Sequence, residues 1–256
     1  MTLFQLFQEL GLPISITFFM VFLRVGAIVA LIPLFGEQSV PARVKLGAAF
    51  AFSVAVLPTV TDTTTQYTFE TLVRTGGIEI MVGLAIGVFF RLFILCLTMA
   101  GQFAAQSTSL AQAFGAPEIE PQPAMSGVLM MGGLALLVIT GFPARVIAAL
   151  MGFYDMFPIG AGIAGADGIM WGIAMISDAF GTAFTLALPF LIAALLYNLA
   201  LGIINKAMPQ LMVSFVGAPA LTLGALLLFA VSAPMILMVW RDWIDLRLMN
   251  PFGAAG

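Results

Sequence analysis

The chain has 256 residues, of which 62% are hydrophobic and 8% are charged. An average soluble domain carries about 25% charged residues, so this chain cannot cover a water-facing surface with polar groups. It contains no histidine, which excludes the usual zinc sites, histidine-based catalytic triads and imidazole proton relays. The net charge of −3 provides no basic surface for nucleic acid. The composition therefore predicts an integral membrane protein and excludes most classes of enzyme. We expect no enzymatic activity, cofactor or metal.

Six apolar stretches are candidates for membrane helices, since about 20 apolar residues cross a hydrocarbon core about 30 Å thick. Three stretches have an adequate length, namely 14–34, 75–99 and 125–142, of which the last ends at Pro143. Residues 44–57 number only 14, a length that fits a re-entrant or protein-buried helix better than a lone crossing. Residues 170–204 and 209–240 are long and contain prolines, so we expect kinked helices and hairpins there.

Four prolines are predicted to interrupt helices, because proline lacks the backbone N–H that a helix needs. They are Pro41, Pro189, Pro209 and Pro219. The lysines and arginines of the connecting segments favour neither membrane orientation, so they do not support a conventional six-crossing topology. We therefore predict an all-α fold of packed helical hairpins, organised as a single domain over residues 1–256.

Several charged or polar residues fall inside or near the apolar stretches. A charge at the bilayer centre costs about 2.5 to 3.5 kcal/mol, so such groups normally face protein or water. Glu79 and Arg91 are about 120° apart around a helix and about 18 Å apart along it, so they cannot pair with each other. Arg24 and Lys206 are hypothesised to anchor contacts with other subunits through charge-assisted hydrogen bonds. The candidates for buried charges or subunit interfaces are Arg24, Arg43, Glu79, Arg91, Lys206 and Gln210.

The segment 101–126 differs from the rest of the chain. It holds four glutamines, three prolines and no basic residue, and it is long for a turn. One interpretation is a surface connector. The other is a glutamine-rich loop at membrane depth, where glutamine can satisfy the backbone without the desolvation penalty of a charge.

Two regions carry motifs of a known family. Residues 22–58, FLRVGAIVALIPLFGEQSVPARVKLGAAFAFSVAVLP, combine an arginine-bearing helix, a Pro-Leu-Phe-Gly turn and a Pro-x-Arg-x-x-x-Gly step before a short apolar helix. Residues 198–229 read NLALGIINKAMPQLMVSFVGAPALTLGALLLF. Between them lie Gly83 and Gly87, whose spacing is typical of close helix packing, and AGQFAAQ at 100–106. In this order the motifs resemble the FliR family of flagellar biosynthetic proteins and its type III secretion counterparts.

The resemblance implies a subunit of the export gate of a bacterial flagellar or type III secretion apparatus, in the cytoplasmic (inner) membrane. It implies a hetero-oligomer with FliP-like and FliQ-like subunits, together with FlhA-like and FlhB-like components. The gate would pass unfolded protein substrates, and the protein would also contact membrane lipid. The segment 101–126 matches the family's pore plug by position, and the plug residues would be Gln102, Gln106, Gln112, Phe114, Gly115 and Pro117.

Two alternatives stay open at this point. The first is a secondary transporter for a small solute, in which proline-broken helices present backbone dipoles at the membrane midplane. The second is a purely structural membrane scaffold. A transporter should bind its solute when purified alone, whereas a gate subunit should purify together with FliP-like and FliQ-like chains.

Overall fold

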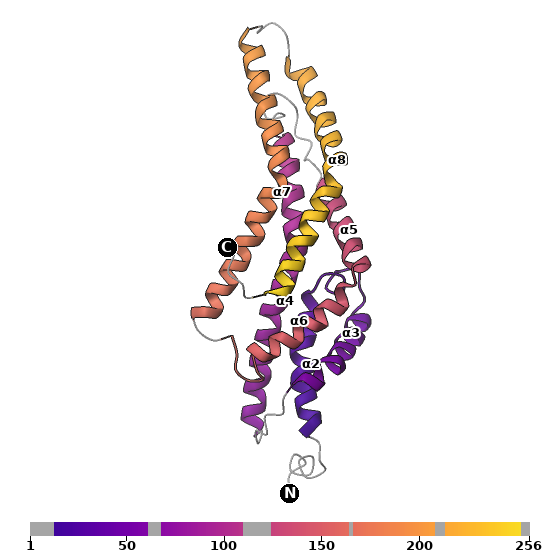
Figure 1. The fold of residues 1–256 in the computed structure, drawn as a ribbon, viewed down its shortest axis with the longest axis vertical. Helices are drawn as coiled ribbons and strands as arrows, with labels where there is room; N and C mark the ends of the chain where they lie inside the picture. The colour runs from indigo at the N-terminus through magenta and orange to yellow at the C-terminus, as the bar shows by residue number, and fades with distance from the viewer. Residues whose placement is uncertain (1–12, 61–67, 110–123, 164–165, 208–212, 252–256) are drawn as a thin grey trace.

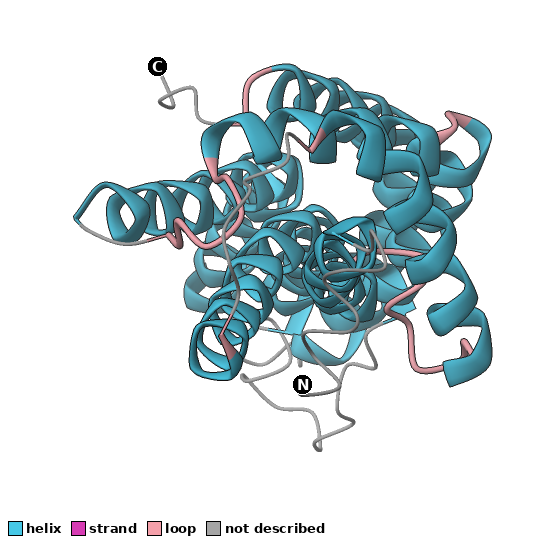
Figure 2. Ribbon diagram, turned by 90° about the horizontal axis from the view of Figure 1, so that it is seen from below, coloured by secondary structure: helices cyan, strands magenta, loops and turns pink. Residues whose placement is uncertain are grey.

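A computed structural model describes residues 13–60, 68–109, 124–163, 166–207 and 213–251. Every regular element in these ranges is a helix, as Figure 2 shows, so the prediction of an all-α membrane protein is confirmed. The elements in chain order are α2 (Pro13–Leu31), α3 (Ala42–Val56), the 3₁₀ helix η1 (Leu57–Thr59), α4 (Phe69–Ser109), α5 (Ala124–Ile139), α6 (Phe142–Met156), α7 (Ala166–Ala207) and α8 (Val213–Met249).

Helix α4 is the axis of the molecule. It is 41 residues long, contains no proline, and packs against α2, α5, α7 and α8 (Figure 1). Of its apolar span, 61% is buried within the chain, against 17% for the spans in α7 and in α8. Its rings of Phe89, Phe90 and Phe93 are almost fully buried and contact one another edge to face. The core of the fold therefore lies along α4.

Glycines allow the closest helix contacts with α4. A Cβ atom at Gly83 would lie 2.4 Å from the backbone oxygen of Arg24 in α2. A Cβ atom at Gly101 would lie 2.4 Å from the Cα of Ser126 in α5. Side chains at either position would push the helices apart, so these two glycines set the spacing of α2 and α5 from α4.

The helix ends differ from the sequence prediction at two prolines. Pro41 directly precedes α3, but α7 continues through Pro189 and α8 continues through Pro219. Neither proline ends its helix, so the predicted interruptions at these two positions are wrong, whereas the kinked helix expected over 170–204 is present (Figure 1). Figure 1 shows α7 changing direction near its middle, as expected where proline removes one backbone hydrogen bond. Pro209 lies outside the described residues.

The predicted loop at 101–126 is also wrong at both of its ends. Helix α4 continues to Ser109 and α5 begins at Ala124. Gln102 and Gln106 are therefore exposed side chains on the last turns of α4. The other predicted plug residues, Gln112, Phe114, Gly115 and Pro117, lie outside the described part of the chain.

Helix α6 is an element that the sequence analysis missed. The chain turns by 75° between α5 and α6, at Gly141 with a φ of 70° and at Pro143 in the first turn of α6. The helix has 15 residues and buries Val146, Leu150 and Phe153 on one side. It is short and amphipathic, so a search for uniformly apolar stretches of about 20 residues does not find it.

Fewer than six helices in the described ranges meet the length and hydropathy of a membrane span. They are α3 together with η1, α4, α7 and α8, while α5 and α6 could form one further, bent span. This agrees with the charge distribution of the sequence, which does not support a conventional six-crossing topology. Most of α3 is not covered by this chain, since Leu46 and Phe50 are 61% and 55% exposed.

We expect Gly83→Ala to destabilise the protein by about 1 to 3 kcal/mol, because the added methyl group overlaps the backbone of α2. The control is Gly77→Ala, also in α4, where no atom lies within 4 Å of the new Cβ. Thermal unfolding in detergent measures both variants. Equal unfolding temperatures for the two variants would contradict the close contact between α2 and α4.

Candidate functional site

A fully buried ion pair joins α2 to α4. The Nε atom of Arg24 donates to Oε2 of Glu79 at 2.7 Å, and Nη2 donates to Oε1 at 3.1 Å. Both side chains are 0% exposed. Two parallel hydrogen bonds between a guanidinium and a carboxylate are a strong and directional arrangement. The sequence places both charges among apolar residues, but it does not show that they are partners.

The same pair also binds the backbone that follows α6. Nη1 of Arg24 donates to the carbonyl of Phe157 at 2.6 Å, and Nη2 donates to the carbonyl of Pro158 at 3.3 Å. The N–H of Gly160 donates to Oε1 of Glu79 at 2.8 Å. The guanidinium carbon lies 4.2 Å from the ring centre of Tyr154 in α6. All these contacts lie within the chain, so Arg24 and Glu79 are buried charges, as the sequence analysis allowed, and a contact of Arg24 with another subunit stays a prediction.

Arg91 does not pair with Glu79, as the helical spacing requires. Its Nη1 donates to Oε1 of Glu37 at 2.5 Å, which links α4 to the segment between α2 and α3. The sequence analysis did not select Glu37. Its signal is an acid directly after the Pro-Leu-Phe-Gly turn, in a region otherwise poor in acids.

A polar cluster holds the C-terminal end of α8, and the sequence analysis did not predict it. Asp178 in α7 accepts from Arg247 at 2.7 Å and from the indole N–H of Trp243 at 2.8 Å. The indole N–H of Trp240 donates to the carbonyl of Phe93 in α4 at 2.7 Å. Arg145 in α6 forms an ion pair with Asp245. These contacts tie one end of α8 to three other helices.

The remaining lengths of α7 and α8 are apolar and largely uncovered. Between Asp178 and Arg241, Lys206 is the one charged residue. Large apolar side chains project outward from both helices, with Leu195 69% exposed and Val231 80% exposed. The two helices extend beyond the rest of the molecule at the upper end of Figure 1. They form an apolar hairpin that is fixed by polar contacts at one end.

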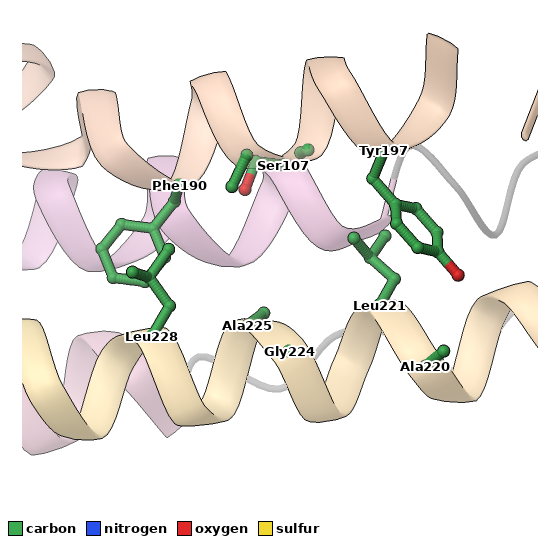
Figure 3. Close-up of a pocket in the computed structure, with 10 residues that line it drawn as sticks. Ser107, Phe190, Tyr197, Ala220, Leu221, Gly224, Ala225 and Leu228 are labelled. Carbon is green, nitrogen blue, oxygen red and sulfur yellow. The ribbon is translucent and has the colours of Figure 1, made fainter. Parts of the chain in front are cut away.

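A groove of about 400 Å³ lies between the arms of this hairpin (Figure 3). Phe190 and Tyr197 project from α7 toward α8, and Leu221 and Leu228 project from α8 toward α7. Small residues form much of the wall, and Ser107 of α4 contributes a hydroxyl. The lining residues are Ser107, Phe190, Ala193, Ala194, Tyr197, Ala220, Leu221, Gly224, Ala225 and Leu228. None of these described lining residues is charged, so this part of the groove suits an apolar occupant.

The other predicted interface residues lie apart from the buried ion pair. Arg43 is exposed at the start of α3, and Lys206 is exposed in the last turn of α7. Gln210 lies outside the described residues. A contact of Arg43, Lys206 or Gln210 with another subunit stays a prediction. Among the residues that the structure describes, no three His, Cys, Asp or Glu side chains gather as metal ligands would.

Asp178→Asn is expected to destabilise the protein by about 3 to 5 kcal/mol, because it removes the carboxylate that faces the largely buried Arg247. Asp242→Asn is the control, since its pair with Arg241 is exposed to solvent and should contribute under about 1 kcal/mol. Thermal unfolding in detergent compares the variants. An unchanged unfolding temperature for Asp178→Asn would contradict a stabilising role for the polar cluster.

Comparison with known proteins identifies the family of this fold. Residues 15–246 match the family described as "Bacterial export proteins, family 1". The chain is 33% identical over 228 residues to the flagellar biosynthetic protein FliR of Caulobacter vibrioides, covering 87% of this chain and 90% of that relative. It is 28% identical over 240 residues to FliR of Bacillus subtilis, covering 90% and 91%. It is also 28% identical over 227 residues to FliR of Escherichia coli, covering 86% and 85%. The chain belongs to family 1 of the bacterial export proteins.

Proposed function

We propose that this protein is a FliR-type subunit of the flagellar export gate in the bacterial inner membrane, where it helps to form the pore for unfolded export substrates. The family match over nearly the whole chain supports this function. The observation that carries it is the apolar hairpin of α7 and α8, which the chain fixes at one end and leaves uncovered along most of its length.

The groove gives the hairpin a feature that contact with lipid alone does not require. Isolated exposed leucines are ordinary on a helix that faces lipid. An open groove between two helices is different, because its walls lose dispersion contacts unless another group fills it. Small wall residues such as Ala193 and Gly224 allow a neighbouring backbone to approach closely. A helix from another membrane subunit fits these requirements.

The proposed partners are FliP-like and FliQ-like chains, which would pack apolar helices against the hairpin. FlhA-like and FlhB-like components would join the same hetero-oligomer. The family match gives no support to the alternative of a secondary solute transporter. The plug role of Gln112, Phe114, Gly115 and Pro117 stays a prediction, because these residues lie outside the described part of the chain.

Co-purification tests the proposed function. The tagged chain is expressed with the FliP-like and FliQ-like chains of the same bacterium, extracted in mild detergent, and analysed by size-exclusion chromatography and mass spectrometry. We expect one complex that contains all three chains. A monodisperse chain that excludes both partners would overturn the proposal.

Leu195→Ser combined with Leu199→Ser tests the outer face of α7. The two leucines are one helical turn apart, and each is more than 60% exposed in the isolated chain. Their loss should lower the recovery of FliP-like and FliQ-like chains at least about tenfold, because two buried leucines contribute several kcal/mol of contact.

The matched control is Leu195→Met combined with Leu199→Met, which keeps both positions apolar and similar in volume. This variant should recover the partners as the unmodified chain does. Equal recovery with the serine and methionine variants would show that this face of α7 does not contact a partner.

A further inference from the structure

We propose that Arg24 and Glu79 are positioning residues. They hold the backbone bend at residues 157–163, which we call the elbow, and thereby fix the orientation of α7 relative to α6. The inference rests on the proposed function in one respect: the orientation of α7 affects assembly only if the hairpin of α7 and α8 contacts the partner subunits. The holding of the elbow itself is a property of the single chain.

Both partners of the ion pair bind backbone as well as each other. The guanidinium donates to two consecutive carbonyls, those of Phe157 and Pro158. The carboxylate of Glu79 accepts from the N–H of Gly160, two residues further along. A guanidinium has five N–H donors and a carboxylate has about four acceptor sites, so the pair has capacity left after its own two bonds. The structure uses that capacity on a single short stretch of backbone.

The conformation of the elbow depends on glycine and on contact with α4. Gly160 and Gly162 have φ values of 79° and 69°, in the left-handed region that favours glycine. The ideal Cβ position of Gly160 is 3.6 Å from Thr75, and that of Gly162 is 3.4 Å from Ile78. The elbow therefore lies against the segment of α4 that also carries Glu79, and the ion pair holds it there.

The first turn of α7 rests directly on the elbow. A Cβ atom at Gly168 would lie 2.3 Å from the side chain of Ile163, so no space separates the two. One turn later, the indole N–H of Trp171 donates to the carbonyl of Pro251, just after α8, at 2.8 Å. A shift of the elbow would thus move the start of α7 relative to the end of α8.

Stability alone does not require these charges. A buried ion pair is costly to desolvate, and replacing both partners with apolar side chains of similar size is often neutral for folding. Apolar side chains, however, cannot bind two carbonyls and an N–H. The ion pair fixes the position of the elbow backbone, which a purely apolar contact would not do. An experiment can therefore distinguish loss of positioning from loss of stability.

The test uses the full chain with Arg24→Met combined with Glu79→Leu. Hydrogen exchange of the amides at 157–163 and thermal unfolding are measured on the chain alone, and partner recovery is measured in the co-expressed complex. We expect a nearly unchanged unfolding temperature and elbow exchange that is at least about tenfold faster, since a lost hydrogen bond is worth about one factor of ten. Recovery of the partner chains should fall by at least a similar factor.

Arg24→Lys is the second variant, because it keeps the charge and removes the planar fork that reaches two carbonyls. It should exchange faster at the elbow even if the double variant fails to fold. The matched control is Arg91→Met combined with Glu37→Leu, which removes another ion pair of α4, the one that joins it to the turn after α2. Its elbow exchange should equal that of the unmodified chain.

A charge reversal, Arg24→Glu combined with Glu79→Arg, separates positioning from simple charge pairing. It restores an ion pair but turns a carboxylate toward two carbonyls, so elbow exchange should stay fast. Slow exchange and full partner recovery with the reversed pair would overturn the inference, as would slow exchange with Arg24→Lys. Absence of partners from the unmodified chain would instead overturn the proposed function, because the exchange measurement does not involve partners.

Discussion

Buried charge determines how the helices pack around α4. The core of this chain is apolar, so an ionised side chain inside it must meet an opposite charge or a backbone dipole. Glu79 and Arg91 project from different sides of α4, and each binds a group from another part of the chain, Arg24 from α2 and Glu37 from the turn after it. Their positions on one helix therefore fix where α2 and its following turn lie.

The ion pairs between helices gather in one part of the molecule. The C-terminal part of α8 is held to α4, α6 and α7 by Asp178, Arg145 and the tryptophans of α8. Most of α7 and α8 offers apolar side chains and a groove between them. This division gives a rigid base and a long apolar hairpin, which suits a subunit that is completed by its neighbours.

The sequence predicts the class of the fold well, because apolar length identifies membrane helices independently of their partners. It also predicts that Arg24 and Glu79 need partners. It does not predict that they bind each other, since they are 55 residues apart and the backbone groups of Phe157 and Gly160 leave no mark in a side-chain pattern.

The helix boundaries were harder to predict for local reasons. Glutamine is a good helix former, so Gln102 and Gln106 extend α4 into a stretch whose polarity indicates a loop. Proline costs a helix one hydrogen bond, and long helices with packed neighbours tolerate that loss, as α7 does at Pro189. Helix α6 was missed because it is short and amphipathic, so its residues do not form a uniformly apolar stretch of about 20.

The bend between α5 and α6 affects how many times the chain crosses the bilayer. Helix α5 is about 24 Å long, and α6, bent away by 75°, advances only about 6 Å further along the same axis. Together they travel about 30 Å, the thickness of one hydrocarbon layer, although they contain enough residues for a much longer rod. If the axis of α5 stands along the bilayer normal, the two helices amount to a single traverse, and the chain on either side of them emerges on opposite leaflets.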